Sequence, residues 1–255
     1  MQIRYVDIDD RMEDLADRMR DDPEVAEEFQ RKYELSWLYH ENALEGLVYS
    51  GEELAAALAA PTLTDATFAS ALQEIRNHKI ALDIAREEAT AKKLKFNLTI
   101  VKRLHEALNQ GIEERIASDH RKDMPLHRAY FHEIAPPPSI QPLLQKLLDG
   151  CETVDFRNAH AVQQAVRLHH GFMQVFPYTE NSGRVGRLLA NLALLHAGYP
   201  LPVIIHATDR QRYYESLRLP ETILRDLTME ALDNALLQAE KFFAETPSRS
   251  RKAAR

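Results

Sequence analysis

The chain has 255 residues with 39 acidic and 32 basic side chains, and its net charge of −7 argues against general nucleic-acid binding, which needs a cationic surface. Its 45% hydrophobic content suits one domain with a buried core. The single cysteine, Cys151, excludes an intramolecular disulfide, and no stretch reaches the roughly 18 apolar residues of a membrane span. We therefore expect a cytoplasmic soluble protein with no membrane or nucleic-acid partner.

Helical periodicity dominates the sequence, and the low glycine content of 8 residues favours helices. The spacing of apolar residues predicts helices over residues 12–20, 23–46, 52–59, 65–93, 97–111, 139–148, 158–175, 183–195, 209–217 and 222–245. The one strand-like run, residues 128–134, predicts a short β-hairpin. Together these elements predict a single all-α domain with a small hairpin arm.

The sequence FPYTENSGRVGR, between two strongly helical segments, predicts a loop that enters a helix. The amides of Asn181, Ser182 and Gly183 would be unpaired first-turn donors near the positive end of the helix dipole, where anions bind. Arg184 and Arg187 lie three residues apart on roughly one face, and two guanidiniums beside free amides suit a polyphosphate. The alternative is that the arginines are solvated or paired with carboxylates, and that Ser182 only caps the helix.

This run resembles the signature loop of the Fic family, H-P-F-x-[D/E]-G-N-G-R-x-x-R. The matching residues are Pro177, Glu180, Gly183, Arg184 and Arg187, with Tyr178 in place of the phenylalanine. The lead-in helix also resembles the family's H-x-x-F pattern through His169 and Phe172. The similarity covers roughly residues 35–220.

The resemblance implies a Fic-type helical domain with a hairpin flap. It divides the chain into an N-terminal helical region over residues 1–96, a Fic-like core over 97–220, and a C-terminal helix with a basic tail over 221–255. Family members transfer AMP from ATP to a protein hydroxyl. By resemblance, Glu180 holds Mg²⁺, the amides of the loop cradle the phosphates, and both arginines grip them.

Phe176 stands where the family has its catalytic histidine. A phenyl ring cannot accept a proton, and loss of a positioned general base costs about 10²–10⁴ in rate. His169 would lie two turns away, about 10 Å along the helix, and His170 would point aside. The histidines in or near the hairpin are open as substitutes: His120, His127 and His132.

We therefore expect a degenerate Fic protein that binds ATP or a related nucleotide with Mg²⁺ and transfers AMP poorly or not at all. The first alternative is an active adenylyltransferase or phosphotransferase that uses a different base. The second is a protein-interaction module with a vestigial pocket.

Further upstream, the sequence ENALEG resembles the end of the family's inhibitory helix, [S/T]-x-x-x-E-[G/N], here within about residues 23–46. The resemblance implies that Glu45 enters the nucleotide site and pairs with Arg187. Glu41 takes the place of the family's hydroxyl residue. The alternative is an ordinary helix end with a solvated Glu45.

Residues 128–134 resemble the flap that positions target proteins in this family. Such a flap would add a strand of the target peptide to its edge. This run is therefore the candidate site for an unidentified protein partner. The resemblance also leaves a homodimer open.

Overall fold

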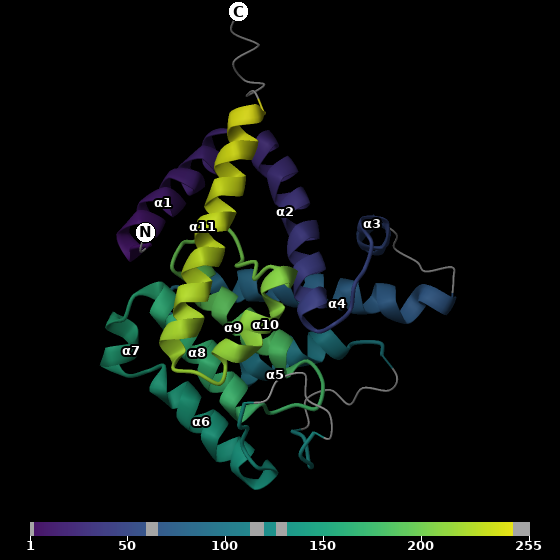
Figure 1. The fold of residues 1–255 in the computed structure, drawn as a ribbon, viewed down its shortest axis with the longest axis vertical. Coiled ribbons are helices and arrows are strands. Elements are labelled where there is room, and N and C mark those ends of the chain that lie inside the picture. Colours follow the sequence, from purple (N-terminus) through teal and green to yellow (C-terminus); the bar gives the residue numbers. More distant parts are fainter. Residues whose placement is uncertain (1–2, 60–65, 113–119, 126–131, 247–255) are drawn as a thin grey trace, which may run out of the picture.

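The computed structural model describes residues 3–59, 66–112, 120–125 and 132–246, and within these ranges it contains helices and no strand. The α-helices, seen in Figure 1, are α1 (Tyr5–Asp21), α2 (Pro23–Leu44), α3 (Gly51–Ala59), α4 (Ala66–Ala89), α5 (Leu98–Asn109), α6 (Ile140–Gly150), α7 (Val154–Asn158), α8 (Ala161–Val175), α9 (Ser182–His196), α10 (Arg210–Ser216) and α11 (Glu221–Glu245). The prediction of an all-α fold is confirmed. The predicted hairpin at residues 128–134 lies largely outside the described residues.

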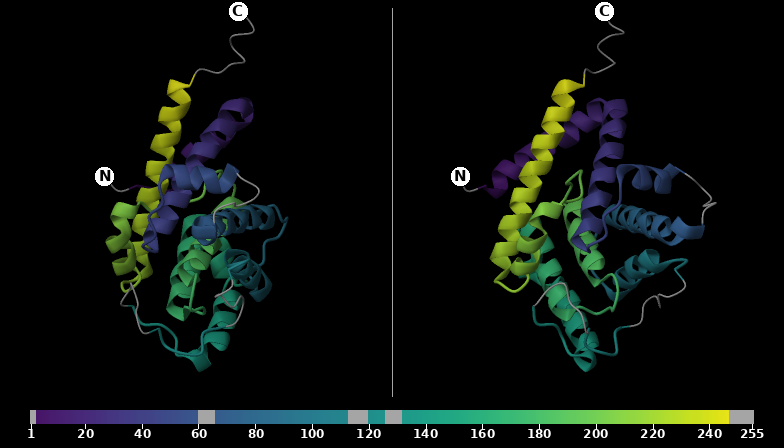
Figure 2. Two further views of the ribbon diagram at one scale, coloured as in Figure 1. Left: turned by 90° about the vertical axis from the view of Figure 1, so that its right-hand side faces the viewer. Right: turned by 45° about the vertical axis from the view of Figure 1, so that its right-hand side comes forward.

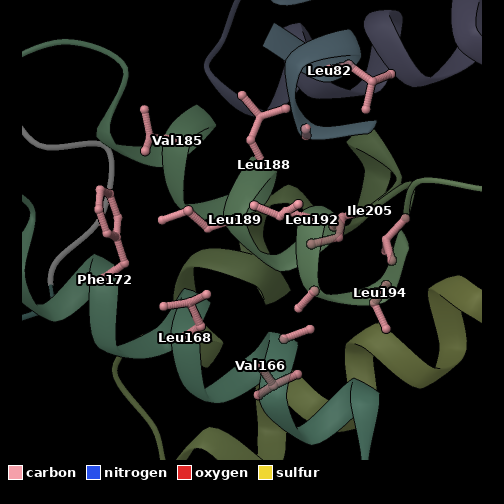
Figure 3. Packing of buried hydrophobic residues seen from close by; sticks show 14 of the residues in the cluster. Leu82, Val166, Leu168, Phe172, Val185, Leu188, Leu189, Leu192, Leu194 and Ile205 are labelled. Atoms are coloured by element: carbon pink, nitrogen blue, oxygen red, sulfur yellow. The ribbon is translucent and has the colours of Figure 1, made fainter. Parts of the chain in front are cut away.

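Helix α9 forms the centre of the molecule. Most of its residues are buried, as expected of a helix that is covered on all sides. In Figure 3, Leu188, Leu189 and Leu192 of α9 lie between Leu168 on α8 and Leu82 on α4, and all five side chains are fully buried. The N-terminus of α9, where the predicted loop ends, is therefore held on a rigid core element.

Helices α1, α2 and α11 stand together at one end of the molecule (Figures 1 and 2). Phe29 of α2 packs against Phe242 and Phe243 of α11, with ring centroids 5.2 and 5.4 Å apart. Arg11 of α1 ties that helix to Asp233 of α11 through an ion pair of 2.5 Å. From this end, α2 runs down to the core, so its last turn reaches the start of α9.

The helix bounds agree with the sequence prediction within a few residues, with two differences. The first helix begins at Tyr5 rather than near Met12. The helix predicted from residue 158 begins at Ala161, because the His160 side chain accepts a hydrogen bond of 3.3 Å from the amide of Val162 and caps the helix there, and the short helix α7 before it was not predicted. None of the helices in the described ranges has the length and apolar character of a membrane span.

Replacing Leu192 with alanine is expected to lower the free energy of unfolding by about 3 kcal/mol, because it opens a cavity at the centre of the packed core. Leu192 is fully buried, whereas Leu237 on α11 is 52% exposed and provides the matched control. Urea unfolding followed by circular dichroism measures both variants. Equal losses for Leu192→Ala and Leu237→Ala would contradict this description of the core.

Candidate functional site

The loop between α8 and α9 has left-handed backbone conformations at both of its ends. Phe176, which caps the end of α8, has φ 48° and ψ 64°, and Asn181, which precedes α9, has φ 64° and ψ 8°. Asparagine tolerates this region better than most residues. For Phe176 the same conformation costs roughly 1–2 kcal/mol, so the surrounding contacts must hold it in place.

Side chains from distant segments hold this loop. The Ser182 hydroxyl donates to the Tyr178 carbonyl at 2.9 Å and accepts from the Tyr178 amide at 2.8 Å. The buried guanidinium of Arg121 donates to the Phe176 carbonyl at 2.7 Å and also to the carbonyl of Ala135. Ser182 therefore closes the loop instead of capping α9. Arg121 was missed from the sequence, because a lone arginine in an irregular segment gives no signal.

The Phe176 ring is 3% exposed and lies edge-on to His132, with ring centroids 6.4 Å apart. The His132 Nε2 is bonded to the Met173 carbonyl at 2.8 Å. His169 is buried with its Nε2 3.0 Å from the Tyr213 hydroxyl, and its pKa is well below the ordinary value because burial and then the Arg187 charge disfavour protonation. The Nε2 atom of each ring thus has a protein partner.

The remaining histidines considered as bases lie elsewhere. The ring of His120 lies 5.8 Å from the Tyr178 ring. His170 Nε2 lies 3.1 Å from the Leu219 carbonyl. His127 lies outside the described residues. Of the histidines considered, His132, His169 and His170 thus each have a ring nitrogen within hydrogen-bonding distance of another protein group.

Arg187 pairs with two carboxylates of the site. Its Nε donates to Glu41 Oε2 at 2.7 Å, and its Nη2 donates to Glu45 Oε1, also at 2.7 Å. Its Nη1 lies 3.2 Å from the Tyr213 hydroxyl. Burial lowers the pKa of Arg187, but the neighbouring carboxylates outweigh burial and place it well above the ordinary value. The Glu45–Arg187 contact expected from the sequence is therefore present.

The Glu45 carboxylate lies against the first turn of α9. A Cβ atom added to Gly183 would come within 2.5 Å of Glu45 Oε1. Burial disfavours the charged carboxyl group, but the charges of Arg187 and Arg184 outweigh it, and the pKa of Glu45 is lowered. The carboxylate thus occupies the position where an anion would approach the helix N-terminus.

The end of α2 is fixed beside this position by two side chains of α10. The Tyr214 hydroxyl donates to the Leu44 carbonyl at 2.6 Å, and Arg210 Nε donates to the same oxygen at 2.8 Å. These bonds satisfy a carbonyl at a helix end that would otherwise lack a partner. They also keep Glu45 next to Gly183.

Arg184 has different partners. Its Nη1 forms an ion pair with Glu74 of α4 and bonds Asn181 Oδ1 at 2.8 Å, and its Nη2 bonds Asn42 Oδ1 at 2.7 Å. The side chain is 3% exposed. Arg184 and Arg187 are therefore both paired with carboxylates, as the alternative interpretation of the sequence held, but they stay buried at the start of α9.

Glu180 is exposed on the loop just before α9. Among the described residues, no group of three or more His, Cys, Asp or Glu side chains is placed to hold a metal ion. Mg²⁺ is usually held by one or two carboxylates together with substrate phosphates. Glu180 therefore fits Mg²⁺ only as a partner of phosphate groups, and not as part of a protein-only site.

Comparison with known sequences finds matches to Fic proteins. A sequence model of the Fic/DOC family matches residues 95–194. The protein adenylyltransferase Fic of Drosophila willistoni is 27% identical over 148 residues, which cover 56% of this chain and 29% of that protein. The chain thus spans less than a third of this relative's length.

Solved structures share the fold at low sequence identity. A Fic-domain signaling protein from Bacteroides thetaiotaomicron has a TM-score of 0.77 and 18% identity, covering 91% of this chain and 96% of its own. The structure of IbpAFic2 in complex with adenylylated Cdc42 has a TM-score of 0.51 and 17% identity, covering 72% and 61%.

Proposed function

Because this chain is a Fic domain protein, we propose that it binds ATP or a related nucleotide at the N-terminus of α9 and transfers AMP poorly or not at all. In this proposal Glu45 inhibits nucleotide binding. The chain acts as a regulatory or scaffolding protein, with the nucleotide controlling its state.

The position of the Glu45 carboxylate carries this proposal. It lies against Gly183, within 2.7 Å of Arg187 Nη2, at a helix end that attracts anions. A carboxylate there mimics the negative charge of a phosphate and must leave before a phosphate can enter. This arrangement supports a nucleotide site in its inhibited state.

Phe176 supports weak or absent transfer. Proton removal from an attacking hydroxyl needs a base within about 3 Å of it, and the Phe176 ring offers none. The neighbouring imidazoles of His132 and His169 already have buried protein partners. The phosphate-binding end of α9 is therefore retained without a group to activate the nucleophile.

The proposal includes a Mg²⁺ ion, for which Glu180 is the protein ligand. The ion supplies charge neutralisation of the phosphates when bound. The exposed carboxylate of Glu180 precedes the first turn of α9, so it is suited to hold an ion that the phosphates also bind. Asn181, Ser182 and Gly183 form the turn on which those phosphates would lie.

A protein partner is a further part of the proposal. Cdc42 in the IbpAFic2 complex supports the search for a protein bound by this chain. The candidate docking run, residues 128–134, lies mostly outside the described residues. A homodimer remains a proposal that a sedimentation measurement would decide.

Replacing Glu45 with glycine or glutamine is expected to tighten ATP binding about tenfold or more, because a charge-assisted contact worth about 1.5–3 kcal/mol no longer competes with the phosphates. Calorimetric titration with ATP and Mg²⁺ measures it. Glu34→Gln is the matched control for the glutamine variant, since Glu34 lies on the same helix and pairs with Arg86 at 2.6 Å, away from α9.

Two outcomes would count against the proposal. If neither Glu45 variant binds ATP, the proposed nucleotide binding is wrong. A protein-interaction module with a vestigial pocket then becomes the better explanation. If the unmodified chain labels proteins efficiently from labelled ATP, the proposed loss of AMP transfer is wrong and the chain uses another base.

A further inference from the structure

A second carboxylate, that of Glu41, pairs with Arg187 beside Glu45. Glu41 is 2% exposed, and its Oε2 accepts from Arg187 Nε at 2.7 Å. The Nε2 of the buried His78 lies 3.7 Å from the same oxygen. Glu41 is enclosed by α2, α4 and α9, so it cannot leave Arg187 as readily as the partly exposed Glu45.

The positive charge of Arg184 is likewise offset by a carboxylate, that of Glu74. Its guanidinium pairs with Glu74, which is 8% exposed, and donates to the side-chain oxygens of Asn42 and Asn181. A buried charge keeps its partner, because separating the pair would leave one of them uncompensated. Glu74 therefore remains with Arg184 when a ligand enters.

The positive charge around the Glu45 carboxylate is consequently offset in part. Three guanidiniums act on it, those of Arg187, Arg184 and Arg210. Glu41 and Glu74 offset two of them. When Glu45 moves out, about one positive charge is left at the start of α9, together with the helix dipole, and the exposed Glu180 reduces it further unless it holds a metal ion.

From this balance we infer that the site does not distinguish nucleotides by their terminal phosphate, and that it takes a nucleoside diphosphate about as well as a triphosphate, with Glu41 as the residue that sets this property. This inference rests on the proposed function and names its nucleotide class. Each added phosphate charge gains affinity only from cations that are not already neutralised. At this site the Glu41 carboxylate already offsets the charge of Arg187, so an added phosphate gains little affinity from that arginine.

The test compares the dissociation constants of ATP, ADP and AMP, each with Mg²⁺ at one ionic strength, by calorimetry on the full chain carrying Glu45→Gly. ATP and ADP are expected to bind within about threefold of each other. Adding Glu41→Gln, which keeps an oxygen acceptor for Arg187 but removes the charge, is expected to tighten ATP about tenfold while tightening ADP less. Adding Glu34→Gln should change neither constant.

The salt dependence of binding gives a second measurement. A nearly neutral site should lose little ATP affinity between low and physiological salt, and the Glu41→Gln variant should lose more. If the variant with Glu41→Gln is too unstable to titrate, Glu41→Thr is used in its place. The ratio of the ATP and ADP dissociation constants of Glu45→Gly alone still tests the inference.

The inference is overturned if Glu45→Gly already binds ATP at least tenfold more tightly than ADP, or if the ratio is unchanged by Glu41→Gln. In either case nucleotide binding, and with it the proposed function, stands. If no variant binds any of the three nucleotides, both the proposed function and this inference are wrong.

Discussion

Combining Phe176→His with Glu45→Gly is expected to raise AMP transfer to protein hydroxyls about 10²–10⁴-fold above the unmodified chain, the usual contribution of a positioned general base. The left-handed backbone at position 176, with φ 48°, suits histidine better than phenylalanine, since histidine is enriched in that region. The glycine at position 45 removes the carboxylate that lies against Gly183. Transfer is measured as label from α-labelled ATP in the chain itself and in an added protein mixture.

Two controls give this result its meaning. Glu45→Gly alone opens the site without a base, and Phe176→Ala with Glu45→Gly removes the ring without supplying one. Both should remain near the background. If the histidine variant is no better than these controls although ATP binds, the fault lies in the loop, where Asn181 and Ser182 replace glycine and asparagine of the motif. If Glu45→Gly alone transfers AMP efficiently, Phe176 does not inactivate the chain.

Replacing Arg187 with alanine is expected to lower the free energy of unfolding by about 4 kcal/mol, because it leaves buried carboxylates without their cation. Glu41 is 2% exposed and loses its bond to Arg187 Nε, and Glu45 loses its bond to Nη2. Urea unfolding at neutral pH measures the loss. The loss should shrink at acidic pH, where the carboxylates abandoned by Arg187→Ala become protonated.

Arg212 provides the matched control for this loss. It also holds two carboxylates, Asp209 at 3.0 Å and Glu230 at 2.9 Å, but its side chain is 54% exposed. Arg212→Ala should cost no more than about 1 kcal/mol, the usual range of surface pairs. Replacing Arg187 and Glu41 together by leucine should recover part of the loss, since the buried charges then disappear as a pair. Equal losses for Arg187→Ala and Arg212→Ala would contradict the buried clamp.

The sequence was sufficient for most of the helices and for the start of α9. Their apolar periodicity is local, and the loop before α9 contains small and polar residues that end one helix and begin the next. The cap of α5 is equally local, since the Asn97 side chain accepts from the Ile100 amide at 3.0 Å. Features decided within one turn of a helix can be predicted from neighbouring residues alone.

Apart from Glu45, the carboxylate partners of the arginines could not be predicted in the same way. Glu74 lies on α4, far from Arg184 in the sequence, and only tertiary packing brings them together. Glu41 was interpreted only as a replacement for the hydroxyl residue of the inhibitory motif. The structure instead places it on Arg187, and its spacing of four residues from Glu45, which puts both carboxylates on one face of α2, was the available signal.

The central claim is that the N-terminus of α9 is a phosphate site that Glu45 fills. A crystal structure of the Glu45→Gly variant with ATP and Mg²⁺ tests it most directly. We expect a phosphate group against Gly183, within hydrogen-bonding distance of Arg187 Nη2, where the Glu45 carboxylate now lies. Phosphates bound elsewhere on the molecule, with that end of α9 closed by other side chains, would contradict it.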